Sequence, residues 1–191
     1  DFNDESTFES VVSTCNDAGI EIVQIGVETL TEDEAHARKR FEFSKLAGNK
    51  IISCHFKPDS FDKAHPMVTR LCDEYDIDVA IHNHGGYHWL GNMEMLEYVF
   101  SRVSPRIGLC LDTAWALDAK HNPVKMAEKF IDRLKSTHIK DFTFQPDRQG
   151  VDTIVGEGNL DLPGLLKLLN DHDYTGPAIL DLPGGPRLAV V

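Results

Sequence analysis

The stretch RIGLCLD at residues 106–112 predicts a strand that ends on a carboxylate, Asp112. Helices are predicted on both sides of this strand. Asn92 can cap the preceding helix, and Asn122 followed by Pro123 is a cap with proline at the first helical position. The segment is therefore predicted to be a strand between two helices, which is the repeating unit of a parallel sheet.

The same alternation extends along the chain in both directions. The predicted strands are residues 20–27, 50–56, 77–84, 106–112, 136–141 and 178–182. The predicted helices are residues 6–18, residues 61–75 and three that begin after Asn92, Asn122 and Asp161. A further helix is predicted to start at a capping box of Thr31 and Glu34 and to end near Gly48. The helix after Asn122 is expected to bury Ile131 and Leu134, and a glycine-bearing loop is expected after the fifth strand. Strands alternating with helices predict either a doubly wound open sheet or a TIM barrel.

Two observations favour the barrel. No G-x-G-x-x-G or Walker A pattern follows any predicted strand. Polar residues recur at the carboxyl ends of the strands, which a barrel gathers into one ring: His55, His82, His84, Asp112, His138, Asp141 and Asp181. We therefore predict an α/β chain of the TIM (β/α)8 type that lacks its first β/α units, with a single barrel domain over 1–183 and a tail at 184–191.

Composition limits the partners of the chain. The 191 residues carry 31 acidic and 19 basic side chains, a formal net charge of −12, which argues against nucleic-acid binding. No apolar run approaches the roughly 20 residues that cross a bilayer, and no signal peptide is visible, so we expect a cytoplasmic chain that does not bind membranes. The four cysteines are expected to be buried free thiols. A homodimer is left open.

Two imidazoles and two carboxylates stand at four of the strand ends. His82, Asp112, His138 and Asp181 form a ligand set that suits one divalent ion, Mn²⁺, Co²⁺, Zn²⁺ or Mg²⁺. The alternative is that each of these polar residues merely begins a surface loop.

Five ordered blocks resemble the xylose isomerase-like barrels, which include sugar phosphate isomerases and epimerases, inosose dehydratases, 3-dehydroshikimate dehydratases and endonuclease IV. The blocks are AIHNHGG (80–86), GLCLDTAW (108–115), STHIKD (136–141), GEGNLDLPGLL (156–166) and YTGPAILDL (174–182). The resemblance implies that metal ligands stand at His82, Asp112, His138 and Asp181. In the epimerases two of these positions are Glu residues that act as an acid/base pair, so His82 and Asp181 shift weight toward elimination.

Further residues are expected to act on a substrate. His84 shares a strand face with His82 and is the predicted general base, because an imidazole exchanges protons near neutral pH. Lys140 shares the face of His138 and is the predicted partner of a substrate oxyanion, while Asp141 is expected to orient a ligand imidazole. Asp181 is predicted to be catalytic as well as a ligand. The predicted substrate-binding residues are His55, Lys57, His88 and Trp115; for Trp115 a core position is the alternative.

The predicted function is that of a metal-dependent isomerase or epimerase of a sugar, sugar phosphate or keto-sugar, which works through a metal-stabilised enediolate. The alternatives are a lyase that dehydrates a keto-sugar or keto-polyol at the same metal site, and a barrel that binds a sugar without turning it over. An endonuclease IV-like DNA repair enzyme is disfavoured by the net charge of −12 and by Trp115, which stands where such relatives place a histidine.

Overall fold

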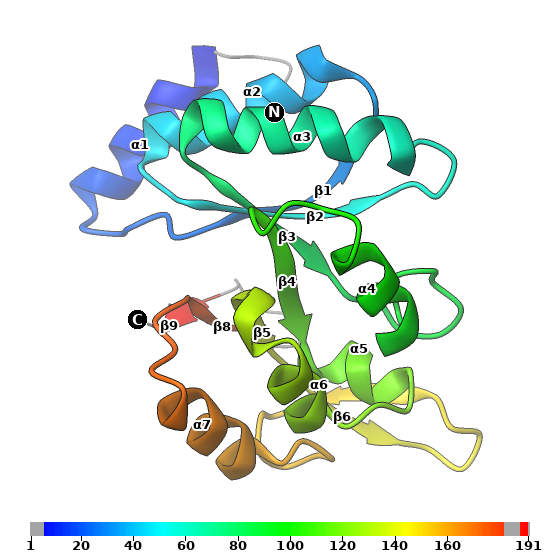
Figure 1. Cartoon of the computed structure of the whole chain (residues 1–191). Helices are drawn as coiled ribbons and strands as arrows, with labels where there is room; N and C mark the ends of the chain where they lie inside the picture. The colour runs from blue at the N-terminus through cyan, green and yellow to red at the C-terminus, as the bar shows by residue number, and fades with distance from the viewer. Residues whose placement is uncertain (1–5, 182–187, 191) are drawn as a thin grey trace. The chain divides into compact units, whose positions relative to one another are not determined.

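The computed structural model describes residues 6–181 and 188–190. The chain, drawn in Figure 1, divides into two compact units. The first unit holds residues up to 80 together with 103–107, and the second holds 81–102 together with the chain from 108 onward. Of the predicted tail, residues 184–187 and 191 lie outside the described part.

The first unit is built from two parallel strands and the helices that follow them. Its elements are α1 (Ser6–Asp17), β1 (Ile25–Leu30), α2 (Glu34–Ala47), β2 (Ile51–Phe56), α3 (Phe61–Tyr75) and the start of β3 (Asp78–His82). β1 pairs in parallel with β2, and α2 and α3 lie on one face of these strands (Figure 1). Leu30, Phe41 and Phe56 are fully buried in the core that results.

Two sequence predictions in the first unit were wrong. β1 begins at Ile25 rather than at Ile20, and its first residue already pairs with β2 at Ile52. The cap of α2 is Asp33 rather than Thr31, because the Asp33 carboxylate accepts the hydrogen bond of the His36 N–H at 3.0 Å. The Thr31 hydroxyl instead accepts from the Asp33 N–H, which makes a turn before the helix.

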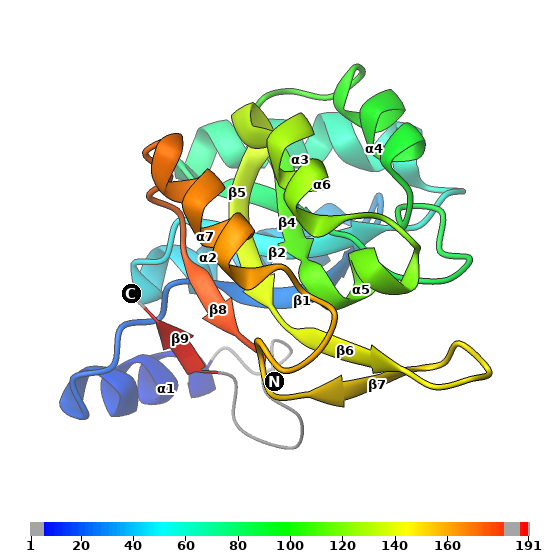
Figure 2. The same cartoon turned by 90° about the horizontal axis from the view of Figure 1, so that it is seen from below.

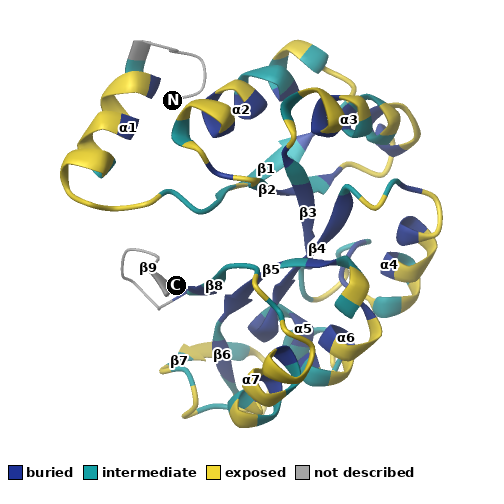
Figure 3. Cartoon of the chain, turned by 60° about the vertical axis from the view of Figure 1, so that its left-hand side comes forward, coloured by how far each residue is buried: buried dark blue, intermediate teal, exposed yellow. Residues whose placement is uncertain are grey.

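The second unit contains the strands whose ends carry most of the predicted site. β4 (Ile107–Asp112), β5 (Leu134–Ile139) and β8 (Ala178–Leu180) pair in parallel in that order, and β9 (Leu188–Val190), within the predicted tail, pairs antiparallel with β8. The helices are α4 (Met93–Phe100), α5 (Thr113–Asp118), α6 (Pro123–Lys129), the short 3-10 helix η1 (Ile131–Arg133) and α7 (Leu162–Asp171). Every residue of β4 is buried, as the dark colour of this strand in Figure 3 shows.

Three further differences from the sequence predictions lie in this unit. α5 was not predicted, since six residues are too few to show a helical period. The helix after Pro123 ends at Lys129, so Ile131 lies in η1 and Leu134 begins β5. The expected loop after β5 contains a hairpin, β6 (Asp141–Phe144) with β7 (Gly150–Thr153), which Figure 2 shows extended side by side.

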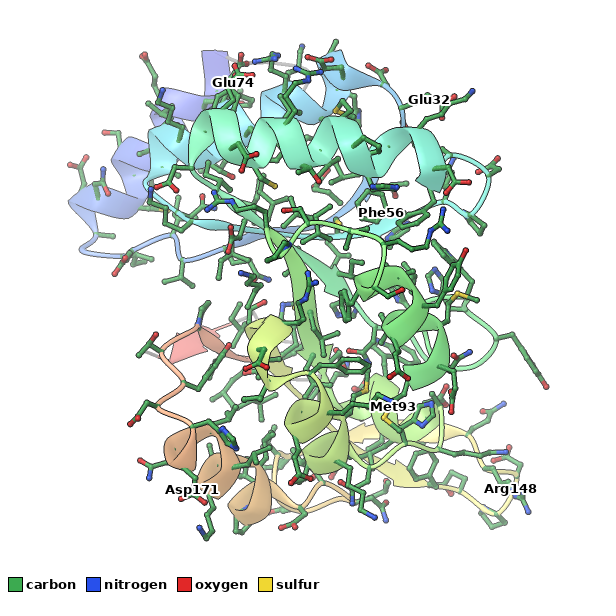
Figure 4. All side chains as sticks on the ribbon, in the orientation of Figure 1. Glu32, Phe56, Glu74, Met93, Arg148 and Asp171 are labelled. Atoms are coloured by element: carbon green, nitrogen blue, oxygen red, sulfur yellow. The ribbon has the colours of Figure 1, made fainter. Side chains whose placement is uncertain are left out.

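In the hairpin, the ring of Phe142 packs closely against the backbone of Gly150. A Cβ atom at Gly150 would lie only 2.5 Å from Cδ2 of Phe142, so no other residue fits this position without movement. Arg148 lies in the turn between the two strands, as Figure 4 shows, and it adopts a positive φ of 68°.

The predictions on the cysteines and on membrane spans can be compared with the structure. Cys54, Cys72 and Cys110 are buried free thiols, as predicted, whereas Cys15 is only half-buried. Burial raises the pKa of the Cys72 thiol to about 12. No helix in the described residues combines the length and the apolar character needed to span a membrane.

Candidate active site

Three buried side chains meet where strands of the second unit end. His82 is the last residue of β3, Asp112 is the last residue of β4, and His138 lies next to the end of β5. Each offers one ligand atom, and these atoms all lie within 4.8 Å of one another. The parallel register pairs Asp112 with His138, which explains why residues 26 positions apart in the sequence converge.

The two oxygens of Asp112 have different surroundings. Oδ1 accepts the Trp115 N–H at 2.9 Å and so caps α5, whereas Oδ2 lies 3.4 Å from Nε2 of His82. The Asn83 side chain holds the backbone of the same residue, since it accepts from the Asp112 N–H at 2.7 Å and donates to the Asp112 carbonyl at 2.9 Å. Hydrogen bonds therefore hold both the backbone of Asp112 and one oxygen of its carboxylate.

The cluster fits a divalent cation. Oδ2 of Asp112 and Nδ1 of His82 are buried and have no hydrogen-bond partner. A buried carboxylate oxygen without a partner is costly, and a coordinated cation removes that cost. Two imidazoles and one carboxylate are ligands that first-row divalent ions accept. His82, Asp112 and His138 are thus a possible metal-binding triad.

Asp181, the fourth predicted ligand, contacts Ile139 and Lys140. It follows β8 directly, is 8% exposed, and its N–H donates to the Ile139 carbonyl at 3.1 Å. Its Oδ2 lies 3.8 Å from Nζ of Lys140. Among the described residues, the group of candidate ligands comprises His82, Asp112 and His138 without Asp181, so the metal and catalytic roles of Asp181 stay predictions.

Lys140 is held between two carboxylates. Its Nζ lies 3.0 Å from Oδ1 of Asp152 in β7, in addition to the contact with Asp181. Its backbone N–H donates to the Thr113 hydroxyl at 2.9 Å, which ties it to the first turn of α5. Asp152 was missed by the sequence reasoning, because residues 142–160 were expected to be a loop. GVDT (150–153) shows no alternation of polar and apolar residues, so the sequence carries no period-two signal for this strand.

The predicted general base lies in a row of imidazoles. The ring centroid of His84 is 4.8 Å from that of His82 and 4.4 Å from that of His88. His88 is oriented by the Leu90 N–H, which donates to its Nδ1 at 3.2 Å. The His138 ring lies 5.0 Å from His82 on the other side. The fold thus brings His84 and His88 beside the triad; their roles stay predictions.

Trp115 is half-buried in the first turn of α5. Its ring meets Phe142 edge-on, with centroids 5.4 Å apart, and a Cβ atom at Gly85 would lie 2.7 Å from Cε3 of Trp115. The indole is therefore packed between the hairpin and the loop after β3. The Trp115 side chain is thus neither fully buried nor fully exposed, and its predicted contact with a substrate stays a prediction.

Asp141 does not orient a ligand imidazole, contrary to the sequence prediction. Its buried carboxylate accepts four backbone N–H groups at 2.9–3.0 Å. The donors are those of Gly156, Gly158, Asn159 and Leu160. Both oxygens are thereby occupied, and Asp141 anchors the loop before α7.

His55 and Lys57 belong to the first unit, at the end of β2 and just after it. Nε2 of His55 shares a hydrogen bond with the Thr29 hydroxyl at 2.9 Å, and Lys57 is exposed. Their role in substrate binding stays a prediction.

Residues 4–190 match the family described as "Xylose isomerase-like TIM barrel", and the chain belongs to this family. The α/β barrel class predicted from the sequence is therefore confirmed. The chain is 26% identical over 153 residues to the inosose dehydratase of Bacillus velezensis (strain DSM 23117 / BGSC 10A6 / LMG 26770 / FZB42), which covers 71% of this chain and 51% of that protein. It thus spans about half the length of the curated relatives it matches.

Solved structures share the fold. The xylose isomerase domain protein from Planctomyces limnophilus superposes with a TM-score of 0.73 at 18% identity, over 93% of this chain and 75% of that one. A D-tagatose 3-epimerase-like protein superposes with a TM-score of 0.72 at 16% identity, over 93% of this chain and 76% of that one. At these identities the likeness concerns the fold.

Proposed function

We propose that this chain belongs to a lyase that removes water from a keto-sugar or keto-polyol of the inosose type. The observation that carries the proposal is the buried cluster of His82, Asp112 and His138, with Lys140 and Asp181 in contact in the same unit. The likeness to an inosose dehydratase supports the dehydration reading over the isomerase or epimerase reading that the sequence placed first.

A divalent ion held by His82, Asp112 and His138, with Asp181 as the proposed fourth ligand, would supply Lewis-acid polarisation of a substrate carbonyl. The first chemical step then belongs to His84, which takes the proton from the carbon next to that carbonyl. The electron pair of the broken C–H bond moves toward the carbonyl oxygen, and the Lys140 ammonium donates a hydrogen bond to the oxyanion that results.

The second step expels the neighbouring hydroxyl. The oxyanion electron pair re-forms the carbonyl, the former enolate pair becomes the α,β carbon–carbon double bond, and the β-carbon–oxygen bond breaks. The protonated His84 returns its proton to the departing hydroxide, so that one water leaves. Asp181 is proposed as a second acid–base group through its contact with Lys140. His82, Asp112 and His138 are only 4%, 1% and 2% exposed, so the proposed ligands themselves are shielded from bulk water.

The test is turnover of an inosose and of a panel of keto-sugars by the chain with Mn²⁺ in D₂O, followed by NMR and mass spectrometry. We expect exchange of the α-proton and loss of the mass of one water. His84→Ala and Lys140→Met should each slow both by about 10²-fold with the ion still bound. His172→Ala, at an exposed position after α7, is the control and should leave the rate unchanged.

Other outcomes point to the remaining functions. Proton exchange without loss of water would favour the isomerase or epimerase. Calorimetric binding of a sugar without exchange would instead identify a non-catalytic sugar-binding barrel and end the lyase proposal.

A further inference from the structure

We propose that Asp152, in the second strand of the β6–β7 hairpin, is a positioning residue for the Lys140 ammonium; the inference rests on the proposed function. The geometry that carries it is the ion pair of 3.0 Å between Oδ1 of Asp152 and Nζ of Lys140. No motif in the sequence marks Asp152, and it reaches Lys140 only through the hairpin.

The register of the hairpin explains how Asp152 arrives there. Phe142 stands opposite Asp152, and side chains of directly paired residues project from the same face of a two-stranded sheet. Lys140 lies between the end of β5 at Ile139 and the start of β6 at Asp141, two residues before Phe142. The ammonium of Lys140 lies 5.7 Å from the centre of the Phe142 ring. Asp152 therefore joins the face on which Lys140 projects.

The two carboxylates around Lys140 differ in distance and exposure. The Asp152 oxygen lies 3.0 Å from Nζ and the Asp181 oxygen 3.8 Å, while the side chains of Asp152 and Asp181 are 39% and 11% exposed. The Lys140 side chain is only 15% exposed, so most of it is covered by neighbouring groups. The ion pair with Asp152 at 3.0 Å is the closer of the two contacts and restricts the position of the ammonium.

An ammonium has three N–H donors. Asp152 at 3.0 Å and Asp181 at 3.8 Å hold Nζ between two carboxylates and so limit the positions that the ammonium can take. In this proposal, a donor that neither carboxylate takes up is the one available to a substrate oxyanion. Asp152 thus acts through Lys140, which stabilises negative charge that develops on the substrate only during the reaction. Removing the Asp152 carboxylate should therefore lower kcat more than it changes KM.

The experiment compares Asp152→Asn and Asp152→Glu with the control Asp132→Asn, an exposed acid of η1 in the same unit. Asp152→Asn should lower kcat for water loss by about 10-fold or more while KM changes by less than about 2-fold. Asp152→Glu restores the charge and should recover most of the rate. Asp132→Asn should match the wild type.

A double-mutant cycle separates positioning from a structural role. In a Lys140→Met background, Asp152→Asn should cause no further loss, because the group through which it acts is already gone. Equal losses in both backgrounds, or a kcat unchanged by Asp152→Asn, would overturn the inference.

A readout without turnover keeps this inference distinct from the proposed function. The rate at which acetic anhydride acetylates Lys140, measured by peptide mass spectrometry, should rise in Asp152→Asn and stay unchanged in Asp132→Asn. If no keto-sugar is turned over, the lyase proposal fails and the labelling decides alone. Equal labelling in the wild type and Asp152→Asn would then refute the positioning of Lys140 by Asp152.

Discussion

A single side chain, Asp112, performs two separate tasks. Its Oδ1 caps α5, and its Oδ2 faces His82 in the candidate metal cluster. The first task is local and concerns stability, because the carboxylate satisfies a backbone donor that the helix leaves free. The second concerns the ion. Two substitutions at this one position can separate them.

Asp112→Ala should abolish metal binding and lower the free energy of unfolding by about 1 kcal/mol, the usual cost of a lost cap. Asp112→Asn keeps an oxygen that can accept the Trp115 N–H, so it should lose the ion without that loss of stability. Metal analysis of protein purified without chelator, where the wild type should hold about one ion per chain, and urea unfolding of the metal-free proteins provide the measurements. Retention of the ion by both variants would remove Asp112 from the ligand set.

At the scale of elements, one buried carboxylate connects the start of the β6–β7 hairpin to the loop before α7. Asp141 begins β6 and accepts four N–H groups of residues 156–160. The loop approaches so closely that a Cβ atom at Gly158 would lie 2.4 Å from Oδ1 of Asp141. This is why the segment GEGNL requires a glycine at its third position.

Asp141→Asn should destabilise the protein by about 2 kcal/mol or more, because an amide nitrogen would face backbone donors and leave them without acceptors. Urea unfolding measures the total. Hydrogen exchange should show the amides of Gly156 and Gly158 opening faster while those of β4 stay protected.

Asp147→Asn is the matched control for that prediction, since Asp147 is exposed and its carboxylate accepts one N–H within the hairpin turn. It should change the free energy of unfolding by less than about 0.5 kcal/mol. Equal losses in the two variants would contradict the anchoring role of Asp141.

For the whole molecule, the net charge of −12 governs encounters with other polyanions. Repulsion from phosphates predicts negligible binding of an abasic DNA duplex at physiological salt. A gel-shift titration checks this expectation, and sub-micromolar affinity would contradict it. Lowering the salt concentration should not reveal binding either, because repulsion strengthens as screening weakens.

Stability should also fall in acid. Hydrogen bonds from Arg70 and then Arg38 lower the pKa of Glu34 to about 2 from 4.5, and Arg38 lowers that of Glu74. A carboxylate with a lowered pKa in the folded state binds fewer protons there than in the unfolded chain between those two values. Its stabilisation is therefore complete above about pH 4.5 and is lost as the pH falls toward about 2.

Glu34→Gln removes this contribution. The free energies of unfolding of the wild type and this variant should differ at pH 7 and converge as the pH falls to about 2, in urea titrations at low salt. Glu128→Gln, at an exposed position of α6, should follow the wild-type curve throughout. A difference between wild type and Glu34→Gln that persists unchanged in acid would contradict the assignment.

The alternation of strands and helices was determined by the sequence alone, and with it the barrel class. Several helix ends were predictable from local caps: Asn92 and Asn122 cap α4 and α6, and Gly48 ends α2 with a positive φ of 81°. The start of α2 was not, because Thr31 and Asp33 both offer a capping oxygen and only the structure shows that Asp33 accepts from the helix. The placement of His82, Asp112 and His138 near strand ends could likewise be predicted, because residues close in the sequence determine where a strand ends.

Only the tertiary structure decided which of those residues touch. It grouped three candidate ligands within 4.8 Å, directed Asp141 to a loop 15–19 residues later, and paired Lys140 with Asp152 through a hairpin. Such contacts depend on strand register, and shifting a register by one residue turns every side chain to the opposite face. Local propensities do not specify that register; the burial of one face and the packing of distant segments do.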